Sequence, residues 1–162
     1  MALSVVVFDV GETLVDEQSA YERWKAEGAT TLAFAERDLH HDALSCLTAL
    51  RARGLRLGAA GNMHAVHEEF LRPHVDFVGS SERWGVRKPH PGFFARIVDE
   101  AGVPAKEILY VGDRVDNDVL PALAAGLRAV RVRRGAHAGV DSPDGAVTIG
   151  SLDELPEALE RA

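Results

Sequence analysis

The sequence predicts an α/β fold, a doubly wound three-layer sandwich around a mainly parallel sheet. Short apolar runs rich in β-branched residues alternate along the chain with longer amphipathic stretches. This alternation is typical of strand–helix–strand units with right-handed crossovers. The run at residues 4–9 is apolar at nearly every position, as expected of a strand that is buried on both faces. A chain of 162 residues suits one domain, so we expect residues 1–162 to form a single core domain.

Further strands are expected where similar runs occur. They lie at residues 55–62, 75–78, 107–113 and 127–134, and residues 146–149 form a last apolar run. Each is too short for a helix, and several end in glycine, asparagine or aspartate.

Helices are predicted between these runs from apolar residues that recur every three or four positions. They cover residues 42–54, 63–71, 91–102, 116–126 and 151–162. Gly54 suits the left-handed end of the first helix, Asn62 can cap the second, and Pro91 suits the first turn of the third. Ser151 and Glu154 have the spacing of a capping box.

Composition excludes several classes of function. The formal net charge of −7 disfavours non-specific binding to nucleic acid or to an anionic membrane, so we expect neither as a partner. The cluster of Arg131, Arg133 and Arg134 is interpreted as the solvated basic face of an edge strand. No run reaches transmembrane length, and the apolar start lacks the basic residues of a signal peptide. Cys46 is the single cysteine, which fits a cytoplasmic location and a small buried side chain.

Polar and small residues gather where three predicted strands end. Asp9 and Gly11 follow the first strand, Gly61 and Asn62 the second, and Asp113 the fourth. In parallel sheets, ligands bind beyond the carboxyl ends of the strands. We therefore expect these residues to share one rim.

The residue types on this rim indicate a phosphate site. Asp9 and Asp113, with Asp116 and Asp118 close behind, would repel one another unless a hard cation such as Mg²⁺ lay among them. Lys88 offers a positive charge, and the predicted helix start at Asn62 offers N–H groups to an anion. Each feature alone is as often a helix cap or a solvated turn. Together, in this order and on one rim, they favour phosphate chemistry.

Four segments resemble the motifs of the haloacid dehalogenase-like hydrolase superfamily. They are "VVVFDVGETLVD", "LRLGAAGN", "GVRKPHPGFF" and "YVGDRVDNDVLPALAAG", and they span most of the chain from Val5 to about Val132. The resemblance implies a Rossmann-like doubly wound core and a Mg²⁺-dependent phosphatase. The last segment is the most specific of the four, because it contains both acidic residues at the family spacing together with the helix that follows.

The resemblance also implies roles for individual residues. Asp9 would attack phosphorus and form an aspartyl-phosphate. Asp9, the main-chain carbonyl of Gly11 and Asp113 would hold Mg²⁺. Lys88 would balance the charge of Asp9 and the phosphoryl group, and Asp118 would orient Lys88 or a metal-bound water. Residues expected to bind phosphate are Gly61, Asn62 and Lys88.

The sequence departs from the family pattern at three points. Gly11 stands where the leaving-group acid is usual, and Gly61 stands where a serine or threonine usually binds phosphate. Loss of a general acid costs about 10²–10⁴-fold in rate, so we expect a slow enzyme that favours good leaving groups unless Glu12 or His64 replaces it. The third departure is length, because residues 17–41 are too few for a full cap and leave only a short insert.

The short insert predicts an open site. An open site suggests either a large phosphorylated substrate or a partner subunit that serves as a lid in a homodimer. Tyr21 and Trp24 share a helical face there; core packing, a dimer contact and a substrate platform all fit this spacing.

The leading hypothesis is thus a Mg²⁺-dependent phosphoric monoester hydrolase. The alternative is a binding module for phosphate or a partner, with weak catalysis or none. Dehalogenation needs no Mg²⁺ and leaves the acidic residues around Asp113 unexplained. The pair His64 and His67 with Glu68 lacks an evident further ligand, which disfavours a zinc site.

Overall fold

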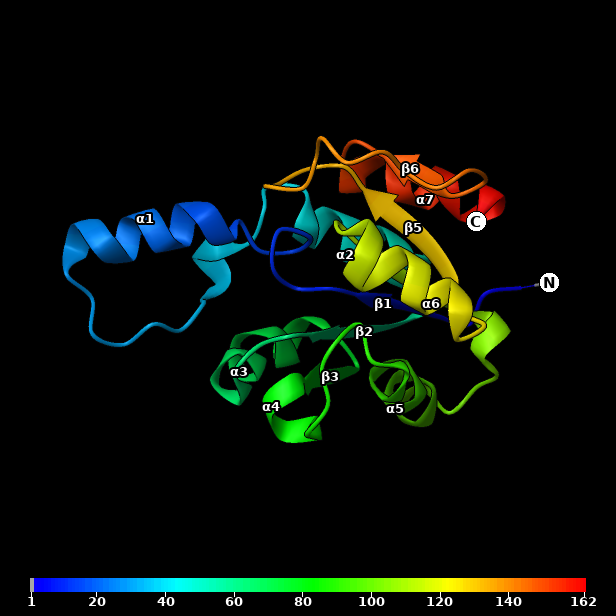
Figure 1. The fold of residues 1–162 in the computed structure, drawn as a ribbon, viewed down its shortest axis with the longest axis horizontal. Helices are drawn as coiled ribbons and strands as arrows, with labels where there is room; N and C mark the ends of the chain where they lie inside the picture. The colour runs from blue at the N-terminus through cyan, green and yellow to red at the C-terminus, as the bar shows by residue number, and fades with distance from the viewer. Residues whose placement is uncertain (1) are drawn as a thin grey trace.

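Parallel strands form one sheet at the centre of the molecule (Figure 1). The computed structural model describes residues 2–162, and within them the sheet has six strands in the order β3-β2-β1-β4-β5-β6. Every pair of neighbours is parallel, which confirms the predicted fold class. The strands are β1 Val5–Phe8, β2 Arg56–Gly61, β3 Phe77–Ser80, β4 Ile108–Gly112, β5 Arg128–Val132 and β6 Val147–Ile149.

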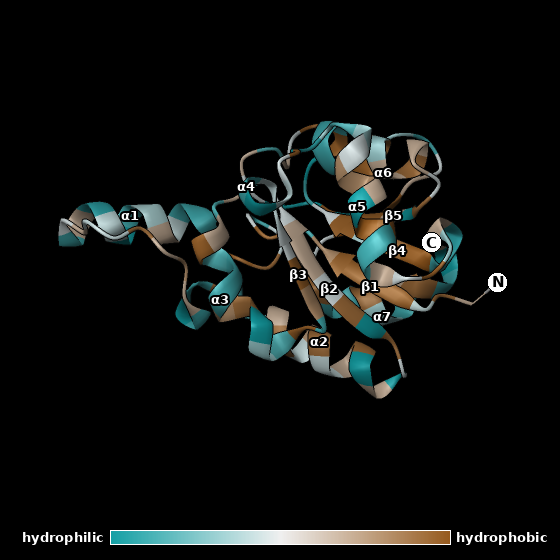
Figure 2. Ribbon diagram, turned by 90° about the horizontal axis from the view of Figure 1, so that it is seen from below, coloured by the Kyte–Doolittle hydropathy of each residue, from teal (hydrophilic) through white to brown (hydrophobic). Residues whose placement is uncertain are grey.

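The two faces of the sheet bury different helices, as expected when successive side chains of a strand point in opposite directions. The helices of the two outer layers are α2 Ala43–Ala52, α5 Pro91–Ala101, α6 Leu120–Ala124 and α7 Leu155–Ala158. Val6 and Phe8 of β1 join the apolar cluster that includes α2 and α7, whereas Val5 and Val7 join the cluster that includes α5 and α6. In Figure 2 the hydrophobic strands lie between these two layers. Several smaller predictions are also confirmed: Gly54 has a positive φ after α2, Pro91 begins α5, and Ser151 and Glu154 form a capping box.

The insert between the first two strands is short and projects from the sandwich. Helix α1, Glu17–Glu27, extends away from the sheet in Figure 1, and the chain returns through an irregular segment and one 3₁₀ turn, Glu36–Asp38. The side chain of Trp24 is buried and stacks on Phe34 with ring centroids 5.2 Å apart, while Phe34 lies 4.5 Å from the ring of His67. Tyr21 remains 52% exposed. The aromatic contacts therefore fasten the insert to the segment after β2.

The segment after β2 differs from the predicted helix. A 3₁₀ turn, Ala65–His67, precedes short helix α3, Glu68–Leu71, and another 3₁₀ turn follows at Arg72–His74. Asn62 is not the cap, because its side chain bonds to the backbone of Lys88. The main-chain N–H of Met63 is also engaged, since it donates to Ser81 Oγ at 3.1 Å.

The interpretation of the three arginines as the solvated face of an edge strand is wrong. Strand β6 pairs with β5, so β5 is internal. The side chain of Arg131 is fully buried and donates to the carbonyls of His137 and Val140 and to Ser142 Oγ, at 2.9, 2.5 and 2.8 Å. Arg131 therefore holds the loop after β5 against the sheet. Of the three, Arg133 alone is exposed.

Arg134 joins distant parts of the chain through a buried carboxylate. Its guanidinium lies 2.7 Å from Asp42 Oδ2 and also donates to the carbonyl of Glu12, in the loop after β1. The same oxygen of Asp42 accepts from Ser151 Oγ at 2.8 Å and from the N–H of Leu152 at 2.9 Å. One carboxylate thus connects the start of α2, the loop after β5 and the C-terminal helical segment.

Cys46 is a buried residue of α2, as expected, and burial raises the pKa of its thiol to about 12. Among residues 2–162, no helix combines the length and the apolar character needed to cross a bilayer.

We predict that Asp42 stabilises the fold in a pH-dependent way. Burial raises its pKa, but the bonds from Arg134, Ser151 and Leu152 outweigh burial and lower the pKa to about 2. Because the pKa is lower in the folded chain, the stabilisation is complete above about pH 4 and is lost as the pH falls towards 2, with a size on the order of 2 kcal/mol. Asp42→Asn should lower the urea midpoint at pH 7, and the gap to the wild type should close towards pH 2–3.

The matched control is Asp99→Asn, which replaces an exposed aspartate on α5. Urea denaturation, monitored by circular dichroism at pH 7, 4 and 3, gives the unfolding midpoints of the wild type and the two variants. If the urea midpoints of Asp42→Asn and the wild type differed as much at pH 3 as at pH 7, the ionised Asp42 carboxylate would not be the source of the stabilisation.

Candidate active site

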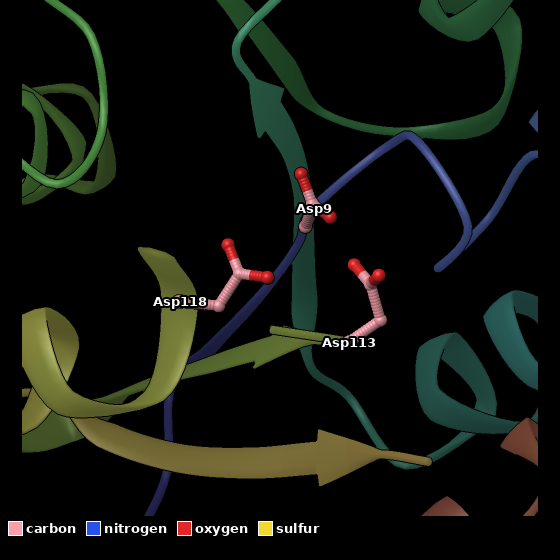
Figure 3. A group of neighbouring side chains, drawn as sticks. All are labelled: Asp9, Asp113 and Asp118. Carbon is pink, nitrogen blue, oxygen red and sulfur yellow. The ribbon is translucent and has the colours of Figure 1, made fainter. Parts of the chain in front are cut away.

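Three aspartates converge at the carboxyl end of the sheet. Asp9 follows β1 and Asp113 follows β4, and these strands are neighbours, with Phe8 opposite Val111. Asp118 comes from the wide helical turn Val115–Val119 that follows β4. Carboxylate oxygens of the three residues lie within 4.8 Å of one another, and Figure 3 shows the three side chains grouped together. All three are at least 94% buried, since none exceeds 6% exposure.

Lys88 lies between two of these carboxylates. Its Nζ is 2.6 Å from Asp9 Oδ1 and 2.6 Å from Asp118 Oδ1, and its side chain is 3% exposed. Burial alone would lower the pKa of Lys88, but the charges of Asp118 and Asp9 outweigh it and raise the pKa above the ordinary value. Lys88 is therefore a charged ammonium that joins the loop before α5 to the ends of β1 and β4.

Two neutral side chains position Lys88. The amide of Asn62 accepts from the N–H of Lys88 at 2.8 Å and donates to its carbonyl at 3.0 Å. Tyr110 Oη accepts from Lys88 Nζ at 3.0 Å and donates to the carbonyl of Ala60 at 2.8 Å. The side chain of Asn62 is thus engaged in placing Lys88, which leaves the main-chain N–H as the group that Asn62 can offer to a phosphate.

The turn after β1 supplies a further contact to the aspartates. The carbonyl of Val10 accepts from the N–H groups of Leu14 and Val15 at 3.0 and 2.9 Å, which closes the turn. Thr13 Oγ1 is consequently 3.1 Å from Asp9 Oδ2 and 3.3 Å from Asp113 Oδ1. The sequence does not predict a role for Thr13 or Tyr110. The available signal was the hydroxyl of Tyr110 within an otherwise apolar strand.

The aspartate cluster carries more negative than positive charge. Burial, followed by the charge of Asp9, raises the pKa of Asp113, and the same two causes in the same order raise that of Asp118. A buried group of three carboxylates with one ammonium favours a hard cation with oxygen ligands. Asp116, which the sequence placed just behind this group, instead faces solvent and pairs with Arg114 at 2.7 Å.

The aspartates lie at the base of an open cleft of about 720 Å³. Its walls include Asn62 and Met63 after β2, Arg87 and Lys88 before α5, and His137 in the loop after β5. Gly61 is buried and does not line the cleft. The expectation of a helix N-terminus at Asn62 is wrong, because the first helical turn after β2 begins only at Ala65.

A carboxylate at the start of the insert, that of Glu17, forms another part of the wall of the cleft. A Cβ atom at Gly11 would lie 2.5 Å from Glu17 Oε2, so the Glu17 carboxylate occupies the space beside Gly11. Burial raises the pKa of Glu17, a hydrogen bond from Tyr21 opposes this, and the charges of Asp9 and Glu12 add to the rise. The sequence does not predict a role for Glu17, because five residues separate it from Gly11.

The two replacements for the general acid that the sequence suggested also line the cleft, but each is engaged with another part of the chain. Glu12 has a φ of 62° and accepts from the N–H of Gln18 at 3.0 Å, at the start of α1. His64 has a side chain that is 79% exposed, and its Nδ1 lies 2.8 Å from Glu82.

The pair His64 and His67 does not form a metal site with Glu68. His67 Nδ1 accepts from the N–H of Phe34, and Glu68 bonds to Ser80 and Arg83.

Comparison with known proteins agrees with this geometry. Residues 85–155 match a family model described as HAD-hydrolase-like. The chain is 35% identical over 124 residues to a glyceraldehyde 3-phosphate phosphatase of Methanocaldococcus jannaschii, covering 72% of this chain and 54% of the relative. It is 32% identical over 130 residues to haloacid dehalogenase-like hydrolase domain-containing protein 3 of Danio rerio, covering 76% and 53%. The chain thus spans about half the length of these curated relatives.

Solved structures share the fold. A HAD phosphatase from Thermococcus onnurineus superposes with a TM-score of 0.78 at 21% identity, over 97% of this chain and 98% of that one. The HAD-hydrolase YfnB from Bacillus subtilis, in a structure bound to magnesium, superposes with a TM-score of 0.79 at 17% identity, over 98% and 99%. By its sequence relatives and by its fold, the chain belongs to the haloacid dehalogenase-like (HAD) hydrolase superfamily.

Proposed function

We propose that the protein is a Mg²⁺-dependent phosphoric monoester hydrolase that works through an aspartyl-phosphate. The observation that carries this proposal is the Asp9 carboxylate, which lies at the base of the cleft and is held from both sides. Lys88 contacts its Oδ1 at 2.6 Å, and Thr13 contacts its Oδ2 at 3.1 Å. The curated relatives named as phosphatases support the same reaction class.

In this proposal a carboxylate oxygen of Asp9 attacks phosphorus as the bond to the leaving-group oxygen breaks. The Lys88 ammonium offsets the charge of Asp9 and of the phosphoryl oxygens. Asp118 holds this ammonium in place, with Oδ1 2.6 Å from Lys88 Nζ. Water then hydrolyses the aspartyl-phosphate and restores Asp9. Fixed contacts to Asp9 keep the nucleophile in one orientation, which reduces the entropic cost of the attack.

The donor set fits a magnesium ion. The carboxylates of Asp9 and Asp113 together with the main-chain carbonyl of Gly11 would hold Mg²⁺, which prefers oxygen ligands and retains several waters. When bound, the ion neutralises the carboxylates and polarises the phosphoryl oxygens. The main-chain N–H of Asn62 and the ammonium of Lys88 would contact the remaining phosphoryl oxygens, whereas Gly61, which does not line the cleft, has no part in this proposal.

The open cleft leaves room for a large phosphorylated substrate or for a partner subunit. The first turns of α1 contribute Glu17 and Tyr21 to one wall of the cleft, and the ring of Tyr21 is exposed there. A homodimer in which a partner covers this side is part of the proposal. A binding module that holds phosphate without turnover is the alternative, and the first experiment below separates it from the enzyme.

We predict hydrolysis of p-nitrophenyl phosphate that requires both Mg²⁺ and Asp9. This leaving group needs no protonation, so Gly11 does not limit the rate. Asp9→Asn should lower the rate by on the order of 10³-fold or more, because the nucleophile is lost. The matched control is Asp116→Asn at an exposed aspartate. A folded wild-type protein that binds Mg²⁺ but is no faster than Asp9→Asn would favour the binding module.

We also predict that Mg²⁺ raises the melting temperature of the wild type. A ligand at tenfold excess over its dissociation constant stabilises by about 1.4 kcal/mol, or roughly 3–5 °C for a chain of this size. Asp113→Asn should remove most of this shift because it removes a ligand, whereas Asp116→Asn should keep it. Differential scanning fluorimetry with and without EDTA measures the shift, and equal shifts in both variants would contradict the assigned ligands.

A further inference from the structure

The space beside Gly11 is filled by a carboxylate from another part of the chain. If Gly11 carried a Cβ atom, Glu17 Oε2 would lie 2.5 Å from it, Cδ 3.3 Å and Oε1 3.7 Å. A real Cβ atom does not approach another heavy atom at 2.5 Å, so a side chain at position 11 and the present position of Glu17 exclude each other. The carboxylate of Glu17 thus occupies the place where a side chain from position 11 would begin.

Local structure places Glu17 there. Asp16 caps α1 by accepting from the N–H of Ser19 at 3.2 Å and from its hydroxyl at 2.8 Å, which makes Glu17 the first residue of the helix. One turn later, the hydroxyl of Tyr21 donates to Glu17 Oε1. Oε2 is consequently the oxygen that faces Gly11.

Tyr21 is itself held by its neighbours in the insert. Its ring centroid lies 5.3 Å from that of Trp24 and 6.2 Å from that of Phe34, and Trp24 is buried. The insert therefore fixes the Glu17 carboxylate through a chain of packed side chains.

The position of Glu17 suits a donor to a bound substrate. The side chain is half-buried and lines the same cleft as Asp9. Within residues 2–162 no arginine or lysine forms a salt bridge with Glu17. Glu12, the other acid close by, uses Oε1 to bind the start of α1 and directs Oε2 towards Gly135.

We propose that Glu17 is the proton donor to the leaving group, in the place of the acid that is missing at Gly11. This rests on the phosphatase activity proposed above. As the Asp9 oxygen forms its bond to phosphorus and the P–O bond to the leaving group breaks, the Glu17 proton passes to the departing alkoxide. Glu17 then remains as a carboxylate and takes a proton from the water that hydrolyses the aspartyl-phosphate, which restores both residues.

This assignment changes the class of substrate. With no acid beside Gly11, the protein would favour aryl or acyl phosphates, whose leaving groups need no proton. With Glu17 as donor, alkyl phosphates of sugars and other alcohols become substrates. The insert, too short to close over a substrate, then contributes to catalysis through a single side chain.

Leaving-group dependence tests the proposal. We would compare kcat/KM of the full chain with Mg²⁺ for propyl phosphate and for p-nitrophenyl phosphate, because kcat/KM reports the step in which the leaving group departs. Glu17→Gln keeps the shape of the side chain but cannot donate a carboxylic proton. We expect it to lower the value for propyl phosphate by about 10²-fold or more and that for p-nitrophenyl phosphate by about threefold or less.

Two glutamine variants serve as comparisons. Glu22→Gln alters an exposed glutamate on the same helix and should leave both values near those of the wild type. Glu12→Gln alters the neighbouring acid of the cleft. If Glu12→Gln, and not Glu17→Gln, selectively lowered kcat/KM for propyl phosphate, the proposal would be overturned.

A rescue experiment tests the shared position. Glu17→Ala empties the space beside Gly11, and Gly11→Asp introduces an acid from the other side. The double variant Gly11→Asp/Glu17→Ala should exceed Glu17→Ala by at least tenfold on propyl phosphate, and an absence of recovery would contradict the shared position.

The outcomes separate the two proposals. Equal losses on the two substrates in Glu17→Gln, or no loss on either, would overturn the role of Glu17 while Asp9-dependent hydrolysis of p-nitrophenyl phosphate still stands. Absence of that hydrolysis in the wild type would overturn the proposed function and this inference with it.

Discussion

The contact of the buried Lys88 ammonium with Asp9 and Asp118 is the interaction on which the site depends. A charge in this position is costly to bury unless it is paired, and here two carboxylates at 2.6 Å pair it. The ammonium draws together the end of β1, the turn after β4 and the loop before α5. Without it, three carboxylates within 4.8 Å of one another would repel with little solvent to screen them. The geometry of the nucleophile therefore depends on a residue 79 positions away in the chain.

Neutral hydrogen bonds make this arrangement specific. Asn62 bonds to both backbone groups of Lys88, and Tyr110 accepts from its ammonium while donating to the backbone of β2. Each polar atom in this set is satisfied by a partner of the opposite kind, which is the condition under which a buried polar network adds rigidity. The edges of the cleft are held in a similar way, because Arg131 and Arg134 tie the loop after β5 to the sheet and to the turn that follows Asp9.

Gly11 and Glu17 illustrate how one space can be filled from two places in a chain. A side chain at position 11 would be fixed by the turn in which it stands. A carboxylate at position 17 must instead be carried in by a helix, and here the cap at Asp16 and the hydroxyl of Tyr21 provide that placement. The contact of Tyr21 with Phe34 inside the insert, and that of Phe34 with His67 outside it, consequently help to place this carboxylate, although Phe34 and His67 lie outside the aspartate cluster.

The sequence alone is enough to predict the strands, a mainly parallel sheet and the rim on which Asp9, Lys88, Asp113 and Asp118 meet. These follow from local patterns, because apolar runs define buried strands and the carboxyl ends of parallel strands share one edge. The order of the strands and the contacts of each polar group depend on tertiary packing. Asn62 was interpreted as a helix cap and Arg131 as a solvated residue, yet the first holds Lys88 and the second is buried. Hydrogen bonds between residues far apart in the chain leave no periodic signal, so the place of Glu17 beside Gly11 emerges only when α1 is packed against the turn after β1.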